Sequence, residues 1–164
     1  MKVDDFWALI EEHVIVDEGE LELDALESAL AKLAPEEIAS FADIFTKLWL
    51  EAYGWELWGA AYLINGGCSD DGFDYFRAWL VGMGREVYEK ALRDPDSLAD
   101  VVDGEVECEE MLYVAGEAYE GATDGEELPP LEGDYPELGE GWDFEDAAEM
   151  RRRYPKLWAK FGES

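Results

Sequence analysis

The chain has 164 residues, of which 42 are Asp or Glu and only 12 are Lys or Arg. The formal net charge of −30 repels nucleic-acid phosphates and anionic membranes, so direct binding to either is not expected. Apolar residues make up 48% of the chain, which excludes a disordered protein and suffices for a buried core. We therefore predict a single helical domain over residues 1–164.

The sequence also bears on the compartment. It contains no apolar run as long as a membrane helix, and its N-terminus lacks the basic flank and apolar stretch of a secretion signal. Its two cysteines, Cys68 and Cys108, are too few for a disulfide framework. These features favour a cytoplasmic protein.

Apolar residues recur at helical spacing through most of the chain. In the first part the pattern predicts helices over residues 4–14, 23–33 and 35–53, the first capped by Asp4 or Asp5. Alternating β-branched residues, which would indicate strands, are not apparent. The fold class predicted is all-α.

The helical pattern continues in the middle of the chain. Residues 55–64 and 70–82 predict two helices joined by a turn at Asn65-Gly66-Gly67, and residues 85–94 predict the next. Apolar residues over 108–121 are spaced as on one face of an amphipathic helix.

The C-terminal part differs in character. Residues 122–141 are acidic, rich in Pro and Gly and without periodicity, which predicts a long surface loop. A C-terminal helical segment is expected over 143–161, with Pro155 kinking it or starting a new turn. The predicted architecture is a compact bundle of about six to eight helices with a long acidic loop near the C-terminus.

Acidic residues concentrate in one part of the chain. Residues 94–150 contain 21 Asp and Glu and no Lys or Arg. Such a run is either a solvated surface or a surface that binds a basic partner. The candidate partner surface consists of seven glutamates: Glu105, Glu109, Glu110, Glu117, Glu120, Glu126 and Glu127.

The turn before residue 70 is the strongest candidate for chemistry. Cys68 could be a nucleophile near a helix N-terminus, but the aspartates that follow disfavour its thiolate. The sequence does not place the only histidine, His13, near Cys68. Phosphate binding is disfavoured by the same aspartates, and Ser69 or Asp70 is better explained as a helix N-cap.

A metal site at this turn is weakly supported. Asp70 and Asp74 are four residues apart and share a helix face, but the alternating ligands of a calcium loop are missing. Asp74 and Arg77 are better explained as a local helix pair worth a few tenths of a kcal/mol. No metal, cofactor or catalytic residue is predicted.

Polar residues among aromatic ones are also typical of small-molecule pockets, although aromatic residues at helical spacing more often form a core. A pocket at the turn would be lined by Trp58, Asn65, Cys68, Asp70, Asp74, Arg77 and Trp79.

The stretch W-x-L-W-G-A-A-Y-L-I-N-G-G-C-S-D-D-G-F-D-Y-F-R-x-W-L at 55–80 resembles the bacterial family named domain of unknown function 4240. Four further segments fit the same family: D-D-F-W-A-L-I-E at 4–11, L-x-P-E-E-I-A-x-F at 33–41, A-L-x-D-P-D-x-L-A-D at 91–100 and E-C-E-E-M-L-Y-V-A at 107–115. The segment W-D-F-x-D-A-A-E-M-R-R-R-Y-P-K-L at 142–157 is similar to the tail of stand-alone members, so the resemblance covers nearly the whole chain.

The resemblance implies a small, helical, bacterial cytoplasmic protein, and it carries no established activity. The favoured hypothesis is a non-catalytic interaction or regulatory module that presents its acidic surface to a basic protein, as immunity-type inhibitors and nucleic-acid mimics do. The alternatives are a small-molecule or enzymatic site at the Asn65–Arg77 turn and an oligomer-forming structural protein.

Overall fold

The computed structural model describes residues 1–130 and 133–162, and it is predominantly helical. The helices are α1 (Val3–His13), α2 (Asp24–Ala31), α3 (Pro35–Glu51), α4 (Trp55–Asn65), α5 (Asp70–Gly82), α6 (Arg85–Arg93), α7 (Val114–Ala122), α8 (Ala147–Arg153) and α9 (Pro155–Phe161). Two 3₁₀ helices, η1 (Pro95–Asp100) and η2 (Glu109–Leu112), precede α7. The predicted all-α fold class is confirmed.

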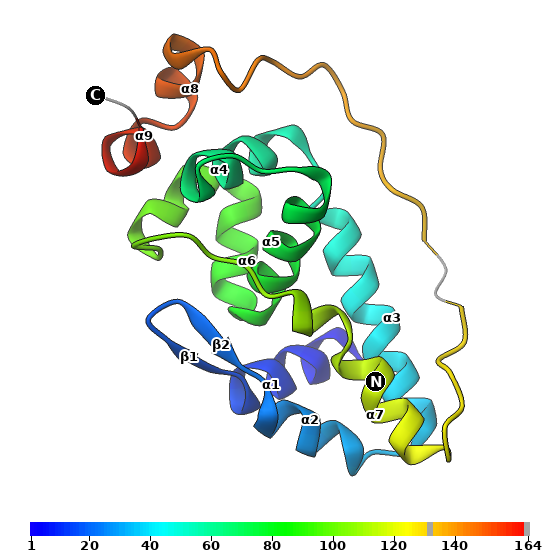
Figure 1. Ribbon diagram of the computed structural model, residues 1–164. Coiled ribbons are helices and arrows are strands. Elements are labelled where there is room, and N and C mark those ends of the chain that lie inside the picture. Colours follow the sequence, from blue (N-terminus) through cyan, green and yellow to red (C-terminus); the bar gives the residue numbers. More distant parts are fainter. Residues whose placement is uncertain (131–132, 163–164) are drawn as a thin grey trace.

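Helix α5 lies at the centre of the core (Figure 1). Every residue from Phe76 to Gly82 is buried, as expected for a helix surrounded by other elements. Helices α3, α4, α6 and η2 pack around it. Helix α7 packs against α2 and α3, so the chain returns to its N-terminal half after leaving α5.

The expectation that the chain forms no strand is wrong for residues 15–22. Strands β1 (Ile15–Asp17) and β2 (Glu20–Glu22) form an antiparallel hairpin in which Asp17 pairs with Glu20. Glu18 and Gly19 between them have φ of 51° and 84°, which is the conformation required by a type I′ turn. Three-residue strands are too short for a clear alternating pattern. Gly19, shortly after an apolar run, could have indicated the turn between them.

Two helix predictions need correction at their boundaries. Residues 108–121 do not form one helix, because the 3₁₀ turn η2 ends at Leu112 and α7 begins only at Val114. The helix expected from residue 143 begins at Ala147. The Asp146 carboxylate accepts a hydrogen bond from the Glu149 backbone N–H at 3.2 Å, so this acid caps α8 from outside the helix.

Residues 123–146, here called the strap, connect α7 to α8 along the outside of α3 and α4 (Figure 1). Their described part contains no regular helix or strand, in keeping with the predicted loop. The strap is packed against the helices: the Trp55 indole N–H donates to the Gly139 carbonyl at 2.8 Å, and the Tyr135 and Tyr53 ring centroids lie 4.7 Å apart.

Candidate functional site

The Asn65–Arg77 turn uses most of its polar groups internally. Ser69 is the N-cap of α5, and its Oγ accepts a hydrogen bond from the Gly72 N–H at 3.1 Å. The Asn65 side chain donates to the Val106 carbonyl at 3.0 Å and accepts from the Val106 N–H at 2.9 Å. Asn65 therefore fastens the segment before η2 to the turn.

The two tryptophans predicted to line a pocket lie in the core. The Trp58 indole donates to the Cys68 carbonyl at 2.9 Å and its ring stacks on Phe73, with centroids 4.7 Å apart. Trp79 is fully buried and donates to the Gly19 carbonyl of the hairpin turn at 2.8 Å. Both side chains are structural anchors, as helical spacing of aromatic residues indicated.

Arg77 is also a core residue, and this corrects the interpretation of a weak local pair with Asp74. Its side chain is fully buried and donates to the Asp74 carboxylate at 2.5 Å and to the Trp49 carbonyl at 2.8 Å. The guanidinium carbon lies 4.1 Å from the centre of the Trp49 ring. Burial lowers the pKa of Arg77 while Asp74 raises it. A buried pair of this kind depends on both partners, because removing one leaves a charge in the core.

Cys68 is half-buried, and burial raises the pKa of its thiol to about 11, with Asp74 raising it further and Arg77 opposing. A thiol with this pKa is protonated at neutral pH and is a poor nucleophile. Burial likewise raises the pKa of Cys108 to about 11. Neither cysteine has the environment of a reactive thiolate.

A hollow of about 410 Å³ does open at the turn. Of the seven predicted pocket residues, Asn65 and Cys68 line it, and the other wall contains Glu20, Glu105 and Glu107. The remaining five lie elsewhere: Trp58, Arg77 and Trp79 are buried, Asp74 pairs with Arg77, and Asp70 is exposed in the first turn of α5. Among the described residues no group of three His, Cys, Asp or Glu is arranged to hold a metal ion.

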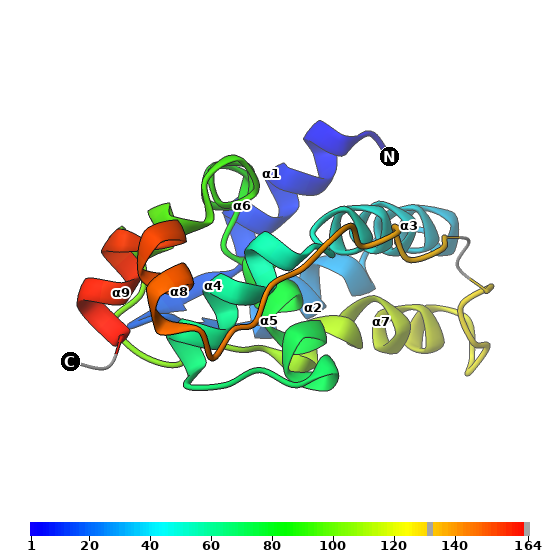
Figure 2. The ribbon, with the colours of Figure 1, turned by 90° about the horizontal axis from the view of Figure 1, so that it is seen from above.

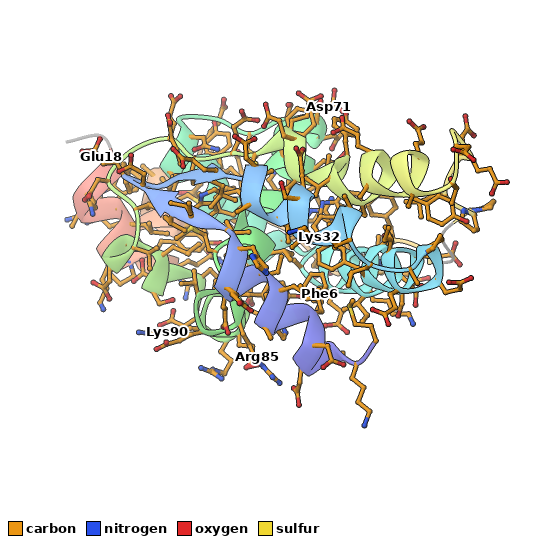
Figure 3. All side chains as sticks on the ribbon, turned by 90° about the horizontal axis from the view of Figure 1, so that it is seen from below. Phe6, Glu18, Lys32, Asp71, Arg85 and Lys90 are labelled. Carbon is orange, nitrogen blue, oxygen red and sulfur yellow. The ribbon has the colours of Figure 1, made fainter. Side chains whose placement is uncertain are left out.

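The seven glutamates predicted as a partner surface lie on one continuous stretch, residues 105–127, here called the acidic segment. Six of them are exposed and Glu109 is half-buried. η2 and α7, which carry four of the seven, lie on the side of the molecule opposite α1 and α6 (Figure 2). Figure 3 shows Arg85 and Lys90 of α6 at the edge opposite Asp71 of α5, the helix against which η2 packs.

Carboxylates of the run 94–150 differ in their partners. Four of them are paired in a region here called the C-terminal seam, which comprises Asp96, Asp100, Asp103 and Glu149 with their partners in α8 and α9. None of the seven glutamates of the acidic segment forms an ion pair within the described parts of the chain.

The acidic segment therefore creates a local excess of negative charge. Burial, repulsion by Glu117 of α7 and by Asp24, and a hydrogen bond shared with Glu117 raise the pKa of Glu27 on α2. Burial together with Glu110 and Glu109 raises the pKa of Glu107, and a hydrogen bond to Glu109 raises the pKa of Tyr113. Each shift has the sign expected where carboxylates accumulate without cations.

A groove between α3 and α7 borders the acidic segment, and sequence reasoning did not identify it. It encloses about 520 Å³, and Glu117 and Glu120 lie among its lining residues. The only available signal was an excess of apolar residues on α3, where Phe41 and Phe45 belong to one helical stripe.

In the described residues no helix is long and apolar enough to cross a membrane. The chain is a small, predominantly helical protein with an acidic segment on η2, α7 and the start of the strap. A family model described as protein of unknown function (DUF4240) matches residues 1–121, so the chain belongs to this family. The strap and helices α8 and α9 lie beyond the matched residues. The family model therefore covers less of the chain than the nearly full-length resemblance seen in the sequence. No curated protein and no solved structure matches the chain.

Proposed function

We propose that the protein is a non-catalytic interaction module whose acidic segment binds a basic protein partner, in a cytoplasmic setting. One observation carries this proposal: the glutamates of the acidic segment lack the cationic partners that acids in the C-terminal seam possess. An ordinary solvated surface intersperses both signs, whereas this segment contains no Lys or Arg.

Clustered carboxylates destabilise the free protein, because like charges repel and each neighbour raises the cost of ionisation. Lys and Arg side chains of a partner relieve that repulsion on binding. Charge complementarity of this kind accelerates association and makes the affinity sensitive to salt. The internal use of Asn65, Arg77 and Asp74 supports an interaction role over catalysis at the turn.

The test begins with affinity capture from native cells at low ionic strength, followed by measurement of Kd on the purified pair between low and high salt. We expect weaker binding as salt rises. The double variant Glu126→Gln/Glu127→Gln removes two exposed charges from the acidic segment, and Glu12→Gln/Glu86→Gln removes two from α1 and α6. Equal affinities of the two variants, or a Kd that is independent of salt, would contradict the proposal.

The hollow at the turn favours a second candidate, a small-molecule site, because Asn65 and Cys68 line a concave space there. A small-molecule library screened by thermal shift would reveal a ligand, and amide NMR shifts would locate it. Shifts centred on Asn65, Gly67 and Val106 support this candidate. A screen in which no compound stabilises the protein, or shifts that fall elsewhere, would count against it.

A further inference from the structure

The groove between α3 and α7 has an apolar floor and an acidic wall. It is lined by Phe41, Ala42, Phe45, Thr46, Trp49, Met111, Leu112, Tyr113, Ala115, Gly116, Glu117, Glu120 and Leu128. Thr46 and Trp49 are half-buried and Tyr113 is 50% exposed, so apolar surface remains open to solvent. Within the described residues the lining includes two carboxylates and no Lys or Arg.

The strap shows what kind of side chain the groove accepts. Leu128 of the strap lies at the groove and packs against the core. A Cβ built on Gly116 of α7 would meet the Leu128 Cδ1 at 3.8 Å and no other heavy atom within 4 Å. Gly116 therefore faces the groove beside Leu128, and a side chain added at this position would enter the groove.

We propose that this groove docks a short amphipathic helix of the basic partner, with apolar side chains on its floor and Lys or Arg against Glu117 and Glu120. This inference rests on the proposed function and names the partner's binding segment. A channel between two helices suits a third helix, whose apolar anchors recur every three or four residues. A volume of about 520 Å³ accommodates several such anchors.

Charge decides among possible occupants. A second copy of this chain also carries a net charge of −30, so it would bring like charges to Glu117 and Glu120. An acidic or neutral peptide would leave both carboxylates without a counter-charge next to an apolar surface. A basic helix neutralises them and covers the apolar floor at the same time, so it satisfies both parts of the groove.

The probe is a fluorescein-labelled 14-residue peptide of Leu and Lys arranged with helical periodicity, with binding followed by fluorescence anisotropy. The same composition rearranged to remove the periodicity tests the need for an apolar face. We expect the periodic peptide to bind at least about tenfold more tightly, because only it can place both residue types correctly. Equal binding of both peptides, or no binding of the periodic one, overturns the proposal.

A pair of glycine variants tests the position of the site. Gly116→Leu fills the groove, whereas Gly121→Leu places the same side chain on the same helix where nothing lies within 4 Å. Neither glycine has a positive φ, and leucine has the higher helix propensity, so both variants should fold. We expect Gly116→Leu to weaken peptide binding about tenfold and Gly121→Leu less than about twofold. Equal effects overturn the groove as the site.

A second pair of variants tests the acidic wall. Glu117→Gln/Glu120→Gln and Glu137→Gln/Glu140→Gln remove the same charge at the same spacing, but only the first changes the groove near Leu128. Exposed ion pairs contribute modestly, so we expect about a fivefold loss for the first variant and less than about twofold for the second.

The two proposals fail in different ways. If the captured partner binds with salt dependence but the groove variants match their controls, the docking site is wrong and the acidic interaction module stands. If binding of the partner ignores salt, the proposed function itself fails, whatever the model peptide does.

Discussion

The C-terminal seam and the acidic segment both contain carboxylates of the acidic run 94–150, but the electrostatic surroundings of these carboxylates differ. In the seam, Asp96 accepts hydrogen bonds from the backbone N–H groups of Lys156 at 3.1 Å and Leu157 at 2.8 Å. In the acidic segment, Glu117 has a neighbouring carboxylate, Glu27, and no cation within the described residues. The acids of the seam bind other parts of the fold, whereas the glutamates of the acidic segment form no ion pair among the described residues.

A count of charges in the sequence does not distinguish acids that are paired within the fold from acids that are not. The cations of the seam come from α8 and α9, which follow the acidic run in sequence and return to it in space. Lys160 donates to the Asp103 carboxylate and the Ala99 carbonyl, both at 2.9 Å. Within the described residues no Lys or Arg forms an ion pair with the acidic segment, and Arg85 and Lys90 of α6 lie at the edge opposite Asp71 (Figure 3).

The largest effect should follow from breaking the seam at Asp96, which is almost fully buried. Asp96→Ala removes two hydrogen bonds to the start of α9 and should lower the free energy of unfolding by about 2 kcal/mol. Urea denaturation measures the loss. Asp96→Asn retains one acceptor and should lose less, and a loss of under about 0.5 kcal/mol for Asp96→Ala would show that the seam contributes little.

A smaller loss is expected at the far end of the seam. Lys160→Met keeps the aliphatic stem but removes the ammonium that donates to two backbone carbonyls and to Asp103. We expect a loss of about 1 kcal/mol, since the group is partly exposed and water can replace some of its contacts. As a control, Lys47→Met breaks one exposed pair with Asp43 and should change stability by less than about 0.5 kcal/mol.

The pH dependence of stability should separate the two regions. Glu27 and Glu107 have pKa values raised above the ordinary 4.5, so the folded state holds their protons more tightly than the unfolded state does. Their contribution to stability falls as pH rises through the raised values. Glu149 has a lowered pKa because Arg152 and Arg153 donate to it, so its contribution is lost as pH falls through that value.

Stability measured by thermal unfolding should therefore increase as pH falls from neutral toward the ordinary carboxyl pKa of 4.5 and decrease in stronger acid. Added salt at pH 7 should also stabilise the protein, because it screens the acidic segment more than the partly covered seam. A profile that declines steadily from pH 7 downward would contradict this division of charge.

The smallest effect should be a gain in stability within the acidic segment. Glu117→Gln removes the charge that helps to raise the pKa of Glu27, and we expect a gain of a few tenths of a kcal/mol, roughly the size of a surface charge interaction. Glu137→Gln in the strap is the control and should be nearly neutral. A loss of stability in Glu117→Gln would mean that Glu117 has a favourable contact in the folded protein.

Local patterns in the sequence determined much of the fold. Ser69 and Pro35 lie at the starts of α5 and α3 as predicted, because caps and first-turn prolines depend on neighbours within four residues. The family membership was also present in the sequence, most specifically in residues 55–80. The hairpin was missed because its strands are only three residues long.

Tertiary structure alone decided how the polar residues are used. The sequence suggested only a local pair of Arg77 with Asp74, but the buried guanidinium also donates to the carbonyl of Trp49, 28 residues earlier in the chain. The groove forms where α3 and α7 lie side by side, and the seam connects Asp96 to α9, some 60 residues later in the chain. Sequence periodicity shows which side of a helix is apolar, but the partner that covers that side is set by the packing of distant segments.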